Sequence, residues 1–312
     1  MTIQLDTAVA NAQLDDLVDF YLPQSADEPS LFEIWERGEA RGDSVTPSTF
    51  SPEYRSWMRD LLVGELRRQE DPALLSLGSG NAAVESDVQR RGYRVLAVDA
   101  MAEAVAIARG KGLEAVRADI TAWTPEGRWP VVYMDGLLGH LLVDGQLPVL
   151  ARIHGWLAAG GHGTLVASND STRNGQGVQQ APGVTGFHWL SEEYLREQAL
   201  AAGFTEVRVE TFHYSRPLSG DRARSVIVAR VGRPAGRAGP APPGRPRPRS
   251  HHPQKKGRSA PCRSARTSHA ACCPCCRRSS STSVPRSTST TSRASRRPAR
   301  PSTRPSRTCP SP

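Results

Sequence analysis

Beyond residue 72, short apolar runs alternate with longer segments in which apolar residues recur every three or four positions. The short runs are typical of buried strands, and the longer spacing is typical of helices that pack one face against a sheet. This pattern predicts strands at residues 73–77, 93–98, 113–118, 129–134 and 163–168. Helices are expected between them, at about residues 82–91, 101–110 and 147–157.

The alternation of short apolar runs and helical segments changes after residue 190. Ser191, followed by two glutamates, is typical of a helix start. Two longer segments, residues 205–214 and 223–231, then read as strands joined by a turn around Gly220. Four strand–helix units and a closing hairpin predict an α/β fold, with a mostly parallel sheet and an antiparallel edge.

Residues 1–50 carry two apolar clusters, at residues 17–21 and 31–35, within polar segments. Ser51 then has the place of a helix N-cap, with Pro52 as the first helical residue. Apolar residues follow at spacings of three and four. We therefore predict an N-terminal helical cap over residues 1–50, ahead of a domain that spans residues 51–232.

Residues 233–312 differ from the rest in composition: they contain 17 Arg, 2 Lys and no Asp or Glu, and they lack Leu, Ile, Met and all aromatic residues. Such a segment cannot bury enough apolar surface to offset its conformational entropy, so a disordered tail is expected. Without these 19 basic residues, the chain has 21 Lys and Arg against 31 Asp and Glu, a net charge of −10.

Three interpretations of this tail compete. Arg, Pro, Ser, Ala and Gly are the residues that a GC-rich gene yields when it is read out of frame, which favours a frameshift product. A basic arm that contacts nucleic-acid phosphates is the second interpretation. The third is a metal site at CCPCC, residues 272–276, but adjacent cysteines lack the paired spacing of zinc ligands.

The position of the cysteines excludes further classes. All six lie in the tail, so residues 1–232 hold neither a disulfide framework nor a thiolate metal site. The start, MTIQLDTAVANAQLDD, lacks the basic and apolar regions of a signal peptide. No run approaches the roughly 20 apolar residues of a membrane span. A soluble, cytoplasmic protein without a metal is therefore expected.

The segment LLSLGSGNAAV, residues 74–84, joins a predicted strand to a helix through two glycines. Glycines let a ligand approach the backbone closely, and the helix N-terminus favours a negative group. Asp99 ends the next strand, 19 residues after Gly80, where a carboxylate can accept both hydroxyls of a ribose. Gly78-x-Gly80-x-x-Ala83 fits dinucleotides and other nucleosides alike, so NAD remains an alternative.

Residues 51–231 resemble the class I S-adenosylmethionine-dependent methyltransferases, a family with a seven-stranded Rossmann-like sheet and helices on both faces. Five motifs carry the resemblance in order: LSLGSGNA (75–82), VDA (98–100), ADI (118–120), VVYMDGLLGHL (131–141) and HGWLAAGGHGTLVAS (154–168). The resemblance implies that S-adenosylmethionine is the cofactor and that the first three motifs bind it, through Gly78, Ser79, Gly80, Asn81, Asp99, Ala100, Asp119 and Ile120.

The chain departs from the family pattern at three positions. Ser76 stands where the family often has an acid near the methionine amine, Ala82 replaces the third glycine, and Pro130 replaces the Asp that opens the fourth strand. The ribose and adenine contacts are unaffected. The partner of the methionine ammonium stays open, with Asp135 or an N-terminal residue as candidates.

The resemblance also places the transferred methyl group near the end of the fourth strand. His140 is the candidate base there, with a packing or capping histidine as the alternative, and Asp135 is the candidate for positioning cofactor or substrate. The glycine-rich loop at residues 169–187 is a candidate substrate lid. Candidates for the wall of the acceptor pocket, with core positions as the alternative, are His188, Trp189, His213 and Tyr214. Tyr21, Phe32 and Trp35 are candidates to cover the cofactor, with the anchoring of a helix as the alternative.

The net charge of −10 disfavours a polyanionic substrate, because nucleic-acid enzymes rely on a basic footprint. MDGL also stands where related enzymes that act on nucleobase or glutamine amines have an Asn-Pro-Pro-type tetrapeptide. We therefore expect methyl transfer to an oxygen or nitrogen of a small metabolite, with no nucleic-acid or membrane partner. GC-rich residue usage favours an antibiotic-tailoring step. The alternatives are an RNA methyltransferase that uses the basic tail and an NAD-dependent oxidoreductase.

Overall fold

The computed structural model describes residues 18–232, with gaps at residues 24 and 26. These residues lie within one compact unit, Met1–Gly244. The predictions of a disordered tail and of a metal site at CCPCC concern residues 233–312, which lie outside the described residues. No helix in the described part of the chain is long and apolar enough to cross a membrane.

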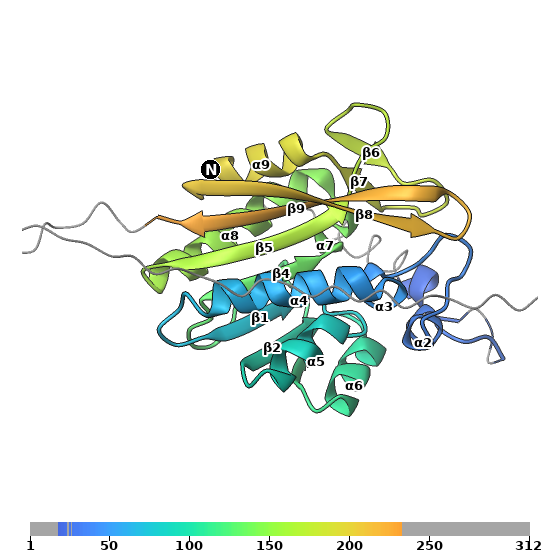
Figure 1. Cartoon of the computed structure of the whole chain (residues 1–312), viewed down its shortest axis with the longest axis horizontal. Helices are drawn as coiled ribbons and strands as arrows, with labels where there is room; N and C mark the ends of the chain where they lie inside the picture. The colour runs from blue at the N-terminus through green and yellow to red at the C-terminus, as the bar shows by residue number, and fades with distance from the viewer. Residues whose placement is uncertain (1–17, 24, 26, 233–312) are drawn as a thin grey trace, which may run out of the picture. The chain divides into compact units, whose positions relative to one another are not determined.

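A seven-stranded sheet lies at the centre of this unit, in the order β3-β2-β1-β4-β5-β9-β8 (Figure 1). The strands are β1 (Ala73–Leu77), β2 (Arg94–Asp99), β3 (Glu114–Arg117), β4 (Val131–Asp135), β5 (Gly163–Asp170), β8 (Glu206–Arg216) and β9 (Gly220–Val231). The strands β1 to β5 pair in parallel, and β9 pairs antiparallel with both β5 and β8. The predicted Rossmann-like sheet with an antiparallel edge is confirmed.

Helices lie before, between and after these strands in the chain. They are α2 (Leu31–Glu36), α3 (Pro47–Phe50), α4 (Pro52–Leu66), α5 (Ala83–Arg90), α6 (Ala102–Gly110), α7 (Leu137–His140), α8 (Val143–Ala159) and α9 (Glu192–Ala201). Two of the predicted N-caps are formed: Ser51 Oγ accepts the Tyr54 N–H, and Ser191 Oγ accepts the Tyr194 N–H.

The helices cover both faces of the sheet. Apolar residues of α4, α5 and α6 share one buried core, and those of α8 and α9 share another. Successive β1 side chains alternate between the two: Leu74 lies in the first core, and Leu75 and Leu77 lie in the second. Because both faces are covered, β1 reads as a continuous apolar run rather than an alternating one.

Four elements differ from the sequence prediction: α7, α8, β6 (Val178–Gln180) and β7 (His188–Leu190). The helix expected at residues 147–157 begins earlier, at Val143, because Gln146 is buried and its amide donates to the Leu138 carbonyl over 2.9 Å. The loop 169–187 contains β6, which pairs with β7. The short α7 was also not predicted. The start of α8 and the pairing of β6 with β7 depend on contacts between residues that are not neighbours in sequence. The helix α7 is too short to produce a periodic pattern.

The N-terminal cap packs on α6. Leu31, Phe32, Ile34 and Trp35 of α2 share a buried cluster with Met101 and Ala104. Ser30 caps α2 and also donates to the Glu103 carboxylate. Within residues 18–50, the helices α2 and α3 are separated by turns and loops, and they belong to the same compact unit as the sheet.

Candidate active site

The strand order reverses at β1, which lies between β2 and β4. In open α/β sheets this reversal opens a crevice at the carboxyl ends of the strands. A cavity of about 620 Å³ lies there. All ten residues predicted for the site line it: Gly78, Ser79, Gly80, Asn81, Asp99, Ala100, Asp119, Ile120, Asp135 and His140.

The loop after β1 forms one wall of the cavity. Gly78, Gly80 and Ala82 all have positive φ, of 65°, 53° and 51°, so the loop needs the left-handed backbone that glycine adopts most easily. Ala82 adopts this left-handed conformation although it has a Cβ. It stands where the family that the sequence resembles has a third glycine. Among the described residues, the buried Ser79 Oγ and Asn81 Nδ2 have no hydrogen-bond partner. Because buried polar atoms are normally paired, this loop fits a polar ligand.

Asp99 lies at the end of β2 and is buried. Its Oδ2 accepts the Gly80 N–H and its Oδ1 accepts the Met101 N–H, both over 2.9 Å. Burial raises the pKa of Asp99, and these backbone hydrogen bonds oppose the rise. A carboxylate offers about four lone pairs, so two remain for ribose hydroxyls.

Asp119 and Ile120 follow β3 on the same wall. Ile120 is buried, as expected of a side chain that packs on a ring. Asp119 is exposed, and the N–H and hydroxyl of Thr121 both donate to its carboxylate over 2.8 Å. The structure therefore brings both residues to the cavity, with Asp119 already in a local hydrogen-bonded turn.

Glu85 is a site residue that sequence reasoning missed. It lies in the first turn of α5, is buried, and lines the cavity. Its Oε1 accepts the Ser76 hydroxyl over 2.6 Å. Burial raises its pKa to about 7. The available signal was the missing acid at Ser76 together with a glutamate on the helix that follows the glycines.

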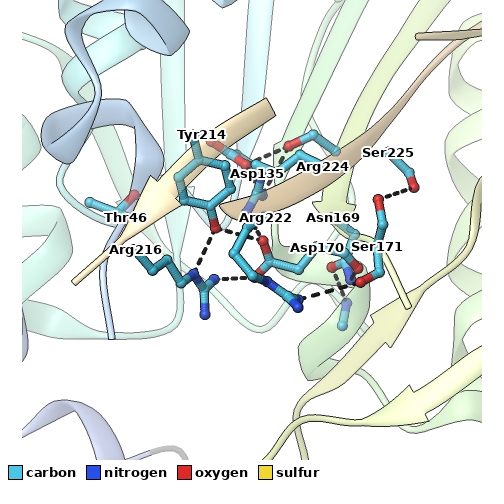
Figure 2. Close-up of polar contacts among 12 residues, drawn as sticks. Thr46, Asp135, Asn169, Asp170, Ser171, Tyr214, Arg216, Arg222, Arg224 and Ser225 are labelled. Atoms are coloured by element: carbon cyan, nitrogen blue, oxygen red, sulfur yellow. Dashed lines mark hydrogen bonds and ion pairs between the residues drawn. The ribbon is translucent and has the colours of Figure 1, made fainter. Parts of the chain in front are cut away.

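Asp135 is engaged by protein groups on several sides. Arg224 donates to its Oδ1 (Figure 2). Ser168 donates to the same oxygen, and Tyr133 Oη donates to its Oδ2 over 3.2 Å. Arg224 is itself buried and lies opposite Asp170 in the β5–β9 register. The ion pair with Arg224 already neutralises Asp135, which favours Glu85 over Asp135 as the partner of a ligand ammonium.

His140 ends α7 and lies between the cap and the loop after β5. Its Nε2 is 2.8 Å from Tyr21 Oη, and its ring centroid is 4.4 Å from that of Phe187. Burial lowers the pKa of His140 to about 4, so the imidazole is neutral at pH 7. Asn169 holds α7 in place, because its Oδ1 accepts the Gly139 N–H over 3.1 Å.

Aromatic residues form the opposite wall of the cavity. Tyr21 stacks on Phe32 with ring centroids 5.1 Å apart, and both line the cavity together with Trp35. Ala181 to Val184 and Phe187 line it from the loop predicted as a lid, and Trp189 lines it from β7. Tyr214 is buried and donates to Asp170, whereas His213 lines a separate, smaller cavity.

Comparisons with known proteins agree with this geometry. A family model described as a methyltransferase domain matches residues 51–209. A tabtoxin biosynthesis enzyme from Pseudomonas amygdali pv. tabaci is 41% identical over 209 residues, which cover 65% of this chain and 82% of that protein.

A solved structure is similar in fold. It is the 1,6-didemethyltoxoflavin-N1-methyltransferase of Burkholderia thailandensis, with bound 1,6-didemethyltoxoflavin and S-adenosylhomocysteine. It aligns with a TM-score of 0.51 at 20% identity and covers 74% of this chain and 93% of its own. At this identity, the likeness concerns the fold alone.

Proposed function

The chain belongs to the methyltransferase-domain family and uses S-adenosylmethionine, and on this premise we propose that it methylates an oxygen or nitrogen of a small metabolite in a natural-product pathway. Membership of this family decides against the NAD-dependent oxidoreductase. The 41% identical relative is a tabtoxin biosynthesis enzyme, which supports a natural-product role.

One observation carries the choice of a small acceptor. A single cavity of about 620 Å³ extends from the glycine loop to Asp170 and Trp189, with Tyr21 and Trp35 of the cap in its wall. Cavities of several hundred Å³ that enclose most of a ligand are typical of small-molecule sites. A polymer would instead need an open groove with a basic footprint, and the net charge of residues 1–232 is −10.

The residues present fit the cofactor. With S-adenosylmethionine bound, Asp99 would accept the ribose hydroxyls, Ile120 would pack on the adenine base, and the Gly78–Asn81 loop would hold the methionine part beside Glu85; all of these residues line the same cavity. When bound, S-adenosylmethionine supplies a sulfonium methyl group for in-line displacement. The chain's own contribution is to align the acceptor with that group and to exclude water, for which Tyr21 and Phe187 are placed.

A transfer assay tests this proposal. The protein is incubated with methyl-labelled S-adenosylmethionine and, separately, with a small-molecule extract or total RNA. We expect label in small molecules, both for the full chain and for a chain that ends at Gly232. Label in RNA alone, lost when the tail is removed, would instead establish the RNA methyltransferase.

Replacement of His140 tests the base. We expect His140→Ala to lower turnover by about tenfold or more while the affinity for S-adenosylhomocysteine is unchanged. Because the pKa of His140 is about 4, its neutral form predominates above pH 5, so this residue should produce no inflection near pH 6.5. His162→Ala is the control, because His162 directly precedes the N-terminal end of β5, whereas the cavity lies at the carboxyl ends of the strands. Wild-type turnover in His140→Ala would leave alignment and desolvation as the whole mechanism.

Replacement of Glu85 tests the ammonium partner. Glu85 has a pKa of about 7 without ligand, and a neighbouring ammonium would lower it, so binding of S-adenosylhomocysteine should release protons near pH 6.5. The affinity of the protein for S-adenosylhomocysteine should rise with pH up to about 7 and then level off. We expect Glu85→Gln to abolish this proton release and to weaken binding roughly tenfold.

Titration calorimetry in buffers of different ionisation enthalpy measures both quantities. Glu114→Gln, an exposed glutamate on β3, is the matched control. Unchanged proton release in Glu85→Gln would remove Glu85 from the site.

A further inference from the structure

A tyrosine of the N-terminal cap contacts the candidate base. Tyr21 Oη is 2.8 Å from His140 Nε2, although the two residues are 119 positions apart in the chain. Both residues line the cavity, and so does Asp99. The ring of Tyr21 stacks on Phe32, and Trp35 meets it edge-on with centroids 5.6 Å apart. The cap therefore holds the Tyr21 hydroxyl at the cavity wall, beside the imidazole.

Both groups are neutral at pH 7. Burial raises the pKa of Tyr21, and the negative charge of Asp99 adds to the rise, so the phenol keeps its proton. Burial lowers the pKa of His140 to about 4, so its imidazole has one protonated and one unprotonated nitrogen. The hydrogen bond between Oη and Nε2 therefore contains one proton, which either the phenol or the imidazole donates.

The phenol is the better donor of the two. A phenol loses its proton more readily than a neutral imidazole does, and an unprotonated imidazole nitrogen is a stronger base than a phenol oxygen. Burial opposes ionisation of either group, so it does not reverse this order. The Tyr21 hydroxyl therefore donates to His140 Nε2, and the imidazole proton lies on Nδ1. In this arrangement His140 has no nitrogen that can take a proton directly from a bound molecule, whereas the Tyr21 oxygen can still accept a hydrogen bond.

We propose that Tyr21 contacts the reactive O–H or N–H of the methyl acceptor and passes its proton to His140. This inference rests on the proposed function, because it deepens the role of His140 as the base. His140 then acts through Tyr21 rather than on the acceptor itself. The N-terminal cap thus contributes a catalytic residue, in addition to covering the cavity.

This relay conserves atoms and charge. The O–H or N–H bond of the acceptor breaks and its proton joins Tyr21 Oη, while the Tyr21 proton moves to His140 Nε2. An electron pair of the acceptor atom forms the bond to the methyl carbon, and the carbon–sulfur pair stays on sulfur. The positive charge of the sulfonium is lost as an imidazolium forms, so the net charge in the cavity does not change.

Two opposing effects act on the imidazolium of His140. Burial disfavours it, and the negative charge of Asp170 favours it. Because burial is the larger effect, His140 gives its proton to water once the product has left. The neutral pair of Tyr21 and His140 is then restored for the next turnover.

Nuclear magnetic resonance tests the direction of the hydrogen bond without any acceptor. The full chain is labelled with ¹⁵N in its histidine rings, loaded with S-adenosylhomocysteine and measured at pH 7. We expect the His140 signals, assigned by their absence in His140→Ala, to show a proton on Nδ1 and none on Nε2. In Tyr21→Phe, the Nε2 signal should shift because its donor is gone. A proton on Nε2 in the wild type would overturn the relay.

Rate measurements test the role of the hydroxyl. Tyr21→Phe keeps the aromatic ring, so its packing on Phe32 should remain. A dilution series of the small-molecule extract, with methyl-labelled S-adenosylmethionine, gives a maximum rate and a half-saturating dilution. We expect Tyr21→Phe to lower the maximum rate by roughly tenfold or more, while the half-saturating dilution and the affinity for S-adenosylhomocysteine stay within about threefold of the wild type. Tyr93→Phe is the control, because Tyr93 is a partly buried tyrosine directly before the N-terminal end of β2.

A double variant distinguishes a relay from two independent contacts. If Tyr21 and His140 act in series, Tyr21→Phe combined with His140→Ala should be no slower than His140→Ala alone. Losses that multiply, or a full maximum rate in Tyr21→Phe, would overturn the inference. A lower melting temperature and a weaker affinity for S-adenosylhomocysteine, with the maximum rate unchanged, would establish a structural role for the hydroxyl and would also overturn it.

Failure of the proposed function gives different results. It would appear as a lack of binding of S-adenosylhomocysteine or as label in RNA alone. Wild-type turnover in His140→Ala would overturn the relay, whereas methyl transfer to a small metabolite would stand.

Discussion

Asp99→Asn is expected to weaken the binding of S-adenosylhomocysteine by at least about 100-fold, because two charge-assisted hydrogen bonds to the ribose are lost. The protein environment adds to the effect. Both Asp99 oxygens accept backbone N–H groups, from Gly80 and Met101, so an asparagine must turn its NH₂ group towards one of these donors. The glycine loop would therefore lose an anchor as well as the ligand contact.

Titration calorimetry with S-adenosylhomocysteine measures this change. Asp60→Asn is the matched control, since Asp60 is an exposed aspartate on α4 that pairs with Arg59. Thermal unfolding of both variants separates loss of the ligand contact from loss of the fold. An affinity within threefold of the wild type in Asp99→Asn would show that the ribose binds elsewhere.

Asp170→Ala is expected to lower the free energy of unfolding by about 3–5 kcal/mol, the range for breaking a buried ion pair by removal of one partner. Asp170 is buried and accepts from Tyr214, Arg216 and Arg224. Its removal leaves two arginines near the cavity with only Asp135 to offset them. Chemical denaturation monitored by circular dichroism measures the loss.

Asp221→Ala is the control for this change, because Asp221 is an exposed hairpin residue that accepts from Ser215 over 2.7 Å. A loss below about 1 kcal/mol in Asp170→Ala, comparable with a surface substitution, would mean that the ion pairs of Asp170 add little to the stability of the fold.

The ion pairs of Asp170 should also make the free energy of unfolding depend on pH. Burial acts to raise the pKa of Asp170, but the charges of Arg224 and Arg216 outweigh it, and the pKa lies below the ordinary value. The stabilisation by Asp170 is then complete above the unfolded pKa of about 3.9 and is lost as the pH falls through the folded pKa. Asp170→Asn should flatten this part of the stability profile below pH 4.

Much of the fold was predicted from local sequence. Ser51 and Ser191 cap helices because their hydroxyls reach N–H groups three residues away, a relation that the sequence displays directly. The apolar runs of the central strands and the helical spacing between them determined the alternation of elements. Connections between consecutive elements are short and do not cross one another. The order of the elements therefore left few sheet topologies possible.

That the residues expected to bind the cofactor line one cavity was predictable for the same reason. The glycine loop, Asp99 and Asp119 each follow a parallel strand, and the carboxyl ends of parallel strands meet at one edge of the sheet. Their convergence on one cavity needs no side-chain detail. The spacing alone could not distinguish NAD from S-adenosylmethionine, because it describes only the turn and the ribose acceptor.

The charged cluster around Asp135 and Asp170 was decided by the tertiary structure. Arg224 and Asp135 are 89 residues apart, and Arg216 and Asp170 are 46 apart, so no local pattern connects them. Glu85 becomes a site residue only because α5 turns its carboxylate towards Ser76. Such pairings depend on strand register and on burial, which convert ordinary charged residues into a specific site by removing water from around them.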